Sequence, residues 1–385
     1  MSLSSILTIF TSIICGAVGA YIFSPAIRAS TSSRNKLHSL EYNEEKDILL
    51  SNPPPLPSGS SSSSPTTINP ENIILSLIIP AYNEEKRLPS MLQHTLKCLD
   101  DAQTEIISLC HSAVGLNHPS THTIIEIIIV SDGSKDQTIA YTQQSIYENP
   151  ILMKLQGPFH IRFITLSSNR GKGAAVQMGM LQSYGKLCLM VDADGATDFA
   201  TGIHAVLDTM ITMRRSITLS PPSSTTRNHT TIYHTLGLYS VYGSRAHLQQ
   251  KQQNQKGSSQ ESTHPSIQRS IIRILLMHGF HFFVRTLCST KIQDTQCGFK
   301  LFTRPVAQLL FQNLHLHRWA FDIELVVMSD LLQIQIEEVS VQWQEMEGSK
   351  LATSKMALIR ASVDMLRDMI CVRLCYSLGI WKIQQ

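Results

Sequence analysis

Four mainly apolar segments between residues 73 and 191 limit most strongly what this chain can fold into. Segments with helical periodicity follow the first three of them. A strand that is apolar on both faces belongs in a parallel sheet covered by helices on both sides, because a half-exposed strand alternates apolar with polar residues. The sequence therefore predicts an α/β fold with a mostly parallel sheet. The expected strands are 73–79, 124–130, 161–166 and 187–191, and the expected helices are 84–99, one starting near 136, and 173–184.

A polar cluster follows each expected strand where that strand ends. Parallel strands place their carboxyl ends at one edge of the sheet, and ligands bind outside that edge. Turn formation or helix capping explains any single cluster, but neither requires all of them to share an edge. The clusters therefore predict a nucleotide-diphosphate site. Its candidate residues are Pro80, Tyr82, Asn83 and Glu84 after the first strand, Asp132 and Gly133 after the second, Lys172 after the third, and Asp192, Ala193 and Asp194 after the fourth.

Asp192 and Asp194 are separated by one small residue at the end of an apolar strand. Mg²⁺ and Mn²⁺ prefer oxygen ligands and usually share them with the phosphates of a substrate. Such a pair alone is more often a solvated loop or a helix cap, and only the neighbouring clusters favour a metal site. Asp198 is expected to cap the next helix.

The N-terminal residues 3–23 carry no charge and are long enough to cross a bilayer core of about 30 Å as a helix. Arg28, Arg34 and Lys36 follow this segment, and basic residues stay on the cytoplasmic side, so the remainder is expected to face the cytosol. A cleaved signal peptide is the alternative, but the basic n-region is missing. The expected organisation is a signal-anchor over 1–24, a Ser/Pro-rich linker over 25–70, the α/β domain over 71–345 and a C-terminal helical region over 346–385.

Charge and cysteine content argue against nucleic-acid binding and against a metal site made of cysteines. The net charge of +3 is too small and too scattered for nucleic-acid binding. The eight cysteines show no metal-type spacing, which favours free thiols in a reducing compartment. Polar insertions at 117–123, 216–231 and 249–265 are expected to be surface loops.

Further motifs follow the four clusters, and the set as a whole carries a resemblance. They are the segments 243–248 (Gly-Ser-Arg-Ala-His-Leu), 294–302 (Asp-Thr-Gln-Cys-Gly-Phe-Lys-Leu-Phe), 318–325 (Arg-Trp-Ala-Phe-Asp-Ile-Glu-Leu) and 347–351 (Glu-Gly-Ser-Lys-Leu). In this order they resemble the family 2 glycosyltransferases, and the later motifs resemble those members that transfer glucose to dolichyl phosphate. The resemblance implies a GT-A (Rossmann-like) fold, UDP-glucose as donor, Mg²⁺ or Mn²⁺ as cofactor, and a place in the endoplasmic reticulum membrane.

Two alternatives stay open beside this one. The first keeps the chemistry but uses GDP-mannose as donor, since relatives of that kind share the front half. The second is a membrane-tethered nucleotide-sugar binding module without turnover. The presence of both aspartates and of Arg245 argues against the second, because a decayed site need not keep them.

The resemblance also implies roles for the donor-site residues. Tyr82 lies against the base or ribose, Glu84 accepts a ribose hydroxyl, and Asp132 accepts the uracil N3 proton in a charge-assisted hydrogen bond. Lys172 faces either phosphate or solvent. Asp194, with Asp192, holds the metal against the diphosphate. Trp319 stacks on the glucose or fills the core, and the core is the favoured expectation.

The chemistry of the acceptor group decides whether the reaction needs a catalytic base. A phosphomonoester has its second pKa at about 6 and is already ionised at neutral pH, so cations matter more than a base. Arg245 is the first candidate for the acceptor phosphate, because a guanidinium binds phosphate in a fork. Asp322 is a candidate base or sugar-orienting residue. Cations of lower rank are Arg269, Arg273, Lys300, Arg318 and Lys350.

Two segments, 267–288 and 356–381, combine helical periodicity with basic residues among apolar ones. This pattern is typical of amphipathic helices that lie in a membrane interface. Core helices of the α/β domain are the alternative.

Overall fold

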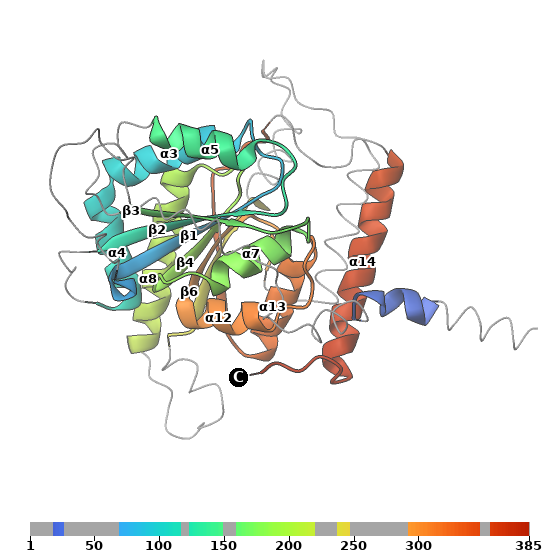
Figure 1. The fold of residues 1–385 in the computed structure, drawn as a ribbon. Helices are drawn as coiled ribbons and strands as arrows, with labels where there is room; N and C mark the ends of the chain where they lie inside the picture. The colour runs from blue at the N-terminus through green and yellow to red at the C-terminus, as the bar shows by residue number, and fades with distance from the viewer. Residues whose placement is uncertain are drawn as a thin grey trace, which may run out of the picture.

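The computed structural model describes residues 18–26, 69–116, 123–148, 159–219, 237–246, 292–346 and 355–384. One sheet of seven strands runs through the molecule in the order β3-β2-β1-β4-β6-β5-β7 (Figure 1). The strands are β1 Ile73–Ala81, β2 Ile124–Ser131, β3 Phe159–Thr165, β4 Leu187–Val191, β5 Tyr239–Ser244, β6 Phe299–Thr303 and β7 Gln335–Ser340. The helices are η3 Pro70–Asn72, α3 Leu88–Asp101, α4 Gln103–Val114, α5 Thr138–Tyr147, α7 Lys172–Leu181, α8 Phe199–Leu219, α12 Arg304–Gln312, α13 Phe321–Leu331 and α14 Lys355–Ser377.

Helices cover both faces of the sheet, as the continuous apolar strands predict. On one face, Leu75, Leu77 and Ile79 of β1 pack with α3, α4 and α8. On the other, Ile78 of β1 packs with residues of α7, α12 and α13. Figure 1 shows α3 above the strands and α7, α12 and α13 below them. The predicted mostly parallel α/β architecture is therefore confirmed.

The strand directions bring seven chain segments to one edge of the sheet. β1, β2, β3 and β4 are parallel, so their carboxyl ends lie together. β6 runs antiparallel to β4 and to β5, so β6 begins at this edge and β5 ends there. β7 is parallel to β5 and also ends there. The register pairs Val191 with Phe299, which places Gly298 next to the aspartates that follow β4.

Three differences separate the expected helices and loops from the structure. The first helix begins at Leu88 rather than 84, because Asn83 has a positive φ of 51° and the next residues form a hydrogen-bonded turn. A second helix, α4, follows it at once. The insertion expected from 216 starts later, because α8 continues to Leu219.

α14 stands at the side of the α/β domain (Figure 1), and one of its faces is buried. Met369, Val372 and Cys375 of α14 pack against Ile323 and Val327 of α13. The helical segment 18–26 lies against α14, where the Tyr21 hydroxyl donates to Asp364 at 3.3 Å. One face of α14 is thus a packing face, as in the core-helix alternative.

Among the described residues, no helix has the length and apolar character needed to cross a bilayer. Most of the expected anchor (3–23) and of the linker (25–70) lies outside the described residues, as does the helix expected at 267–288. All six described cysteines are free, and five of them are buried.

Candidate active site

The loops after β1 and β2 are joined by reciprocal hydrogen bonds. The Asn83 side chain accepts from the amide of Lys135 at 2.8 Å, and the Ser134 hydroxyl accepts from the amide of Asn83 at 3.1 Å. The Thr138 hydroxyl accepts from the amide of Glu84 at 2.7 Å. These bonds fix the backbone on which Tyr82 and Glu84 are carried, and Pro80 is buried within β1 itself.

Glu84 is buried and forms a two-point ion pair with Arg87, in which both nitrogen–oxygen distances are 2.7 Å. The expected contact of Glu84 with a ribose hydroxyl would have to be made alongside this pair. Arg87 was not a candidate residue. The only signal for it in the sequence is its spacing of three residues from Glu84.

Asp132 connects the second loop to the third. Its two carboxylate oxygens accept from the amides of Arg170 and Gly171 at 2.7 and 2.8 Å. Burial raises the pKa of Asp132, and these two amides oppose the rise. Gly133 has a φ of +65°, and a Cβ there would lie 2.5 Å from the backbone of Ser168, so only glycine fits. Asp132 therefore organises the third loop, whether or not it also accepts a base N–H.

Lys172 links the third loop to the fourth. Its Nζ lies 2.6 Å from Oδ1 of Asp192 and 5.9 Å from the ring centre of Trp319. Burial acts to lower the pKa of Lys172, but the neighbouring carboxylates Asp192 and Asp322 raise it overall, so the side chain is an ammonium. Asp132 and Asp194 therefore belong to one continuous group of loops.

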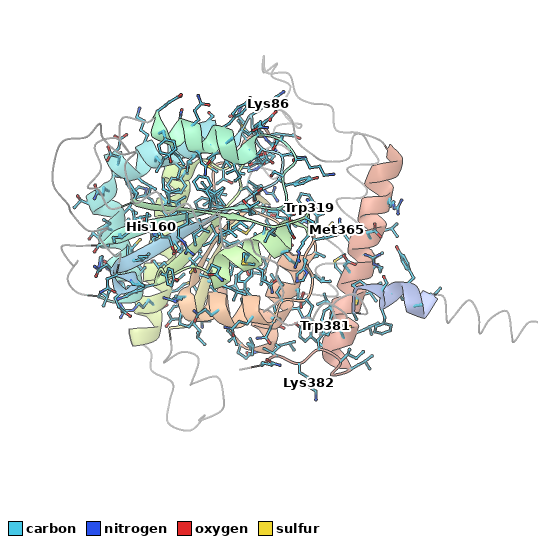
Figure 2. The ribbon with its side chains drawn as sticks, viewed as in Figure 1. Lys86, His160, Trp319, Met365, Trp381 and Lys382 are labelled. Atoms are coloured by element: carbon cyan, nitrogen blue, oxygen red, sulfur yellow. The ribbon has the colours of Figure 1, made fainter. Side chains whose placement is uncertain are left out.

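Trp319 is 57% exposed on the loop before α13, and in Figure 2 it lies between the sheet and α14. The expectation that it fills the core is wrong. The loop places its ring beside Lys172, where an aromatic face attracts an ammonium. An exposed indole at a polar edge leaves the stacking expectation in place.

Asp192 and Asp194 are half-buried, whereas Ala193 between them is buried. Asp194 accepts from the amide of Ala196 at 3.0 Å. Burial, and then the charge of Asp192, raise the pKa of Asp194. Two carboxylates are thus held close together at a partly dry position. Among the described residues, no group of three His, Cys, Asp or Glu side chains could hold a metal, so any cation would need ligands from the substrate or water.

Gly298 was not predicted, although it sets the space around Asp192. A Cβ at this position would lie 1.9 Å from Oδ2 of Asp192. The only sequence signal for Gly298 is its place in the motif that starts at Asp294, because its position opposite the end of β4 comes from the strand pairing.

Replacing Gly298 by Ala is therefore expected to displace the Asp192 carboxylate and to lower kcat by about a hundredfold, since misplacement of a positioning group by about 1 Å has effects of that size. Steady-state kinetics would measure it. Gly202→Ala is the control, because its Cβ would meet only the Phe299 ring, at 3.1 Å. Equal activity of the two variants would show that Asp192 does not need its observed position.

Asp322 and Lys300 form a buried ion pair, and the charge of Asp322 also acts on Lys172. Nζ of Lys300 donates to Oδ1 of Asp322 at 2.7 Å and to the carbonyl of Cys297 at 2.5 Å. Lys300 has no exposed surface, so the expectation that it contacts the acceptor phosphate is corrected: its charge serves Asp322. Burial raises the pKa of Asp322, and Lys300 and Lys172 oppose the rise.

Arg245, at the end of β5, already uses one edge of its guanidinium. Nε and one Nη donate to the two oxygens of Asp294 at 2.7 and 2.8 Å, and its amide donates to the same carboxylate at 3.0 Å. The expected fork is therefore made with Asp294, and a phosphate reaches this guanidinium only from its other edge. The guanidinium also lies 5.4 Å from the ring centre of Trp343.

Other expectations have mixed outcomes. Asp198 caps α8, accepting from the amide and hydroxyl of Thr201 at 2.9 and 2.6 Å. Arg318 is exposed beside Trp319. The candidates Arg269, Arg273 and Lys350 lie outside the described residues.

Comparison with known proteins is consistent with this geometry. The model of glycosyl transferase family 2 matches residues 76–280. A dolichyl-phosphate β-glucosyltransferase of Dictyostelium discoideum is 41% identical over 314 residues, 82% of this chain and 78% of the relative. That of Homo sapiens is 34% identical over 358 residues, 92% of this chain and 90% of the relative. That of Saccharomyces cerevisiae is 36% identical over 312 residues, 81% and 78% of the two chains.

Among solved structures, M. tuberculosis glucosyl-3-phosphoglycerate synthase aligns with a TM-score of 0.44 at 14% identity, covering 80% of this chain and 81% of that one. The family match and the relatives assign the chain to its family without this structural alignment. The chain therefore belongs to glycosyl transferase family 2, with the GT-A α/β fold, and the relatives it matches over most of its length are dolichyl-phosphate β-glucosyltransferases.

Proposed function

We propose that this chain transfers glucose from UDP-glucose to dolichyl phosphate, with inversion at the anomeric carbon and release of UDP. One observation carries the proposal: Asp194 and the Lys172–Asp192 pair lie beside an exposed Trp319 at the sheet edge of a chain whose relatives are named for this reaction. The product, dolichyl β-D-glucosyl phosphate, would serve as glucose donor in the assembly of the N-glycan precursor.

The loops after β1, β2 and β3 suit the nucleotide. Tyr82 offers an aromatic face, and Asp132 and Glu84 offer carboxylate oxygens for a base N–H and a ribose hydroxyl. Because Asp132 already holds the third loop, binding of the base and placement of Lys172 are physically connected. Lys172 brings a fixed positive charge to the side where the diphosphate is expected.

A divalent cation, Mg²⁺ or Mn²⁺, fits the donors after β4. Asp194 and Asp192 supply hard oxygen ligands, and burial, followed by the charge of Asp192, raises the pKa of Asp194. Two carboxylates leave coordination positions for diphosphate oxygens and water. When bound, the cation offsets the charge that develops on the leaving UDP.

The acceptor phosphate arrives ionised, so the protein has to position it rather than deprotonate it. Arg245 remains the best described cation for this task, through the guanidinium edge that Asp294 does not occupy. Asp322, held by Lys300, suits orientation of a sugar hydroxyl, since a carboxylate fixed by a buried partner has one defined position.

Membrane attachment completes the proposal. We place the protein in the endoplasmic reticulum membrane through a single N-terminal span, with the GT-A domain facing the cytosol. The uncharged segment 3–23 and the basic residues after it support this placement. Exposed Val363 on α14 and Leu378 directly after it, together with exposed Arg360 and Arg373, are suited to a lipid interface.

Purified full-length protein in detergent tests the proposal, with UDP-glucose or GDP-mannose as donor, dolichyl phosphate as acceptor, and Mn²⁺ either added or chelated. Glucosyl lipid is expected only with UDP-glucose and Mn²⁺. Mannosyl lipid instead would identify the alternative donor. Binding of UDP-glucose without turnover under all conditions would leave a binding module and overturn the proposal.

A further inference from the structure

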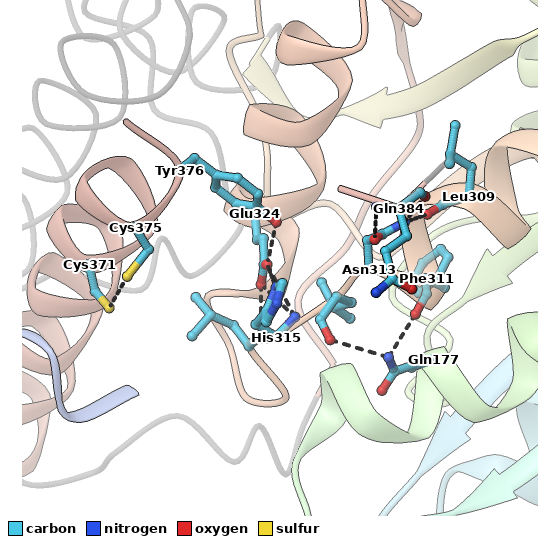
Figure 3. Close-up of polar contacts among 12 residues, drawn as sticks. Gln177, Leu309, Phe311, Asn313, His315, Glu324, Cys371, Cys375, Tyr376 and Gln384 are labelled. Atoms are coloured by element: carbon cyan, nitrogen blue, oxygen red, sulfur yellow. Dashed lines mark hydrogen bonds and ion pairs between the residues drawn. The ribbon is translucent and has the colours of Figure 1, made fainter. Parts of the chain in front are cut away.

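Glu324 is a fully buried carboxylate on α13, two residues after Asp322, with several donors gathered around it. Its oxygens accept from the amide of Leu316 at 2.7 Å, from the amide of His315 at 3.1 Å and from Nδ1 of His315 at 2.8 Å. They also accept from the hydroxyl of Tyr376 at 2.9 Å. Figure 3 shows His315 and Tyr376 converging on this one side chain. None of these groups is needed for the donor or acceptor contacts described above.

The C-terminal residues 378–384 pack against the loop that carries His315. The Trp381 ring stacks on His315, with ring centres 4.2 Å apart and planes 3° apart, and Trp381 is buried. Asn313 and Gln384 exchange two hydrogen bonds of 2.9 and 2.7 Å (Figure 3). The end of α14 and residues 378–384 are therefore fastened to the start of the loop 313–320.

The other side of this loop rests on α7. The Gln177 side chain donates to the carbonyls of Phe311 and Leu314 at 2.7 and 3.3 Å. The carbonyl of His317 accepts from the amide of Ala174 at 3.1 Å, and a Cβ at Gly171 would lie 2.5 Å from that carbonyl oxygen. The loop thus lies between the C-terminal segment and the residues that carry Lys172. Its own end supplies Trp319 and leads into Asp322.

We propose that the C-terminal segment 376–384 is a positioning element of the active site. It acts through Glu324 and His315 to hold the loop 313–320, and so fixes Trp319 against Lys172 and the start of α13 that carries Asp322. The inference rests on the proposed function only in naming the reaction that the loop serves. A segment following the helix expected at the lipid surface thereby contributes to the geometry at the sugar donor.

The test compares Trp381→Ala with Ile380→Ala in the full-length protein. Ile380 is the matched control, since it is the adjacent residue and is 54% exposed. For Trp381→Ala we expect kcat to fall about tenfold with KM for UDP-glucose unchanged, because the loop is misplaced while the nucleotide loops are not. Amide hydrogen exchange is expected to rise at 313–320 but not in β1 or β2. Ile380→Ala is expected to match the wild type in both measurements, and Trp381→Phe, which keeps a stacked ring, to recover most of the kcat.

A purely structural role would give a different result. If Trp381→Ala loosens 313–320 yet turns over as fast as Ile380→Ala, the inference is wrong. If its Tm, UDP binding and kcat fall together, Tyr376→Phe decides, because it removes a single hydroxyl: unchanged kcat overturns the inference, and a fall in kcat at unchanged Tm supports it. Absence of turnover in the wild-type protein would contradict the proposed function instead. In that case the exchange measurement alone decides whether the segment holds the loop.

Discussion

Replacing Asp194 by Asn is expected to lower kcat/KM by at least about a thousandfold, since a metal-held leaving group accounts for several kcal/mol of transition-state stabilisation. Asn keeps the shape and an oxygen that can accept from the Ala196 amide, so the loop after β4 should survive. What is lost is one of the two carboxylate charges that favour a divalent cation. Kinetics with UDP-glucose over a series of Mn²⁺ concentrations would measure the loss, and added Mn²⁺ should restore little of it.

Asp198→Asn is the matched control, four residues further on in the same loop. Asp198 caps α8, and its hydrogen bonds with Thr201 lower its pKa. Loss of the charge should cost about 1 kcal/mol or less of stability and leave turnover unchanged. A depressed carboxyl pKa stabilises the fold above the ordinary carboxyl value, and that contribution disappears as the pH falls from this value through the lower folded-state pKa, so control and wild type should converge in acid. Equal loss of activity in both variants would place the critical charge outside the metal site.

The first four strands of the sheet could be predicted because each one is recognisable from its own residues. β1, β2 and β4 are mainly apolar and buried on both sides, and such strands fit a covered parallel sheet. The convergence of their loops then follows from direction alone. For this reason Asp132, Lys172 and Asp192 could be assigned to one place without knowledge of any contact between them.

β5 and β7 were harder to predict, since neither has that local signature. β5 contains Tyr, Ser and Gly, and β7 at the edge has no fully buried residue and carries two glutamates. These strands are held by pairing with segments far away in the chain, and the antiparallel β6 between β4 and β5 depends on the same long-range pairing. Sequence periodicity does not record such partners.

The partners of the charged site residues could not be predicted either, because they lie far away in the sequence. Arg245 pairs with Asp294 across 49 positions and Lys300 pairs with Asp322 across 22, so neither pair forms a spacing motif. Without their partners, both cations are candidates for the acceptor phosphate, Arg245 in first place and Lys300 at lower rank. Trp319 was misjudged for a related reason: its bulk favours the core, but its position on a loop at the strand ends exposes it.

Replacing Lys300 by Met is expected to lower the free energy of unfolding by about 3–5 kcal/mol, because removing one member of a buried ion pair leaves the other charge uncompensated. Lys300 is fully buried, and its ammonium is shared between Asp322, the Cys297 carbonyl and the Tyr242 ring, 5.2 Å away. Met matches the stem in length and adds no charge. Urea unfolding of detergent-solubilised protein, followed by circular dichroism, would give the difference from the midpoint at constant slope.

The double variant Lys300→Met/Asp322→Asn separates stability from catalysis. Without a charge at 322 there is nothing left uncompensated, so most of the lost stability should return, as it does when both members of a buried pair are made neutral. The deficit of Lys300→Met should also shrink toward acid pH. Without Lys300 the folded-state pKa of Asp322 stays above its unfolded value, so proton uptake favours the folded state as the pH falls. Turnover should stay low in the double variant if Asp322 orients the sugar, because an amide in its place carries no charge. A double variant no more stable than Lys300→Met would show that the cost comes from packing of the lysine stem rather than from the unpaired carboxylate.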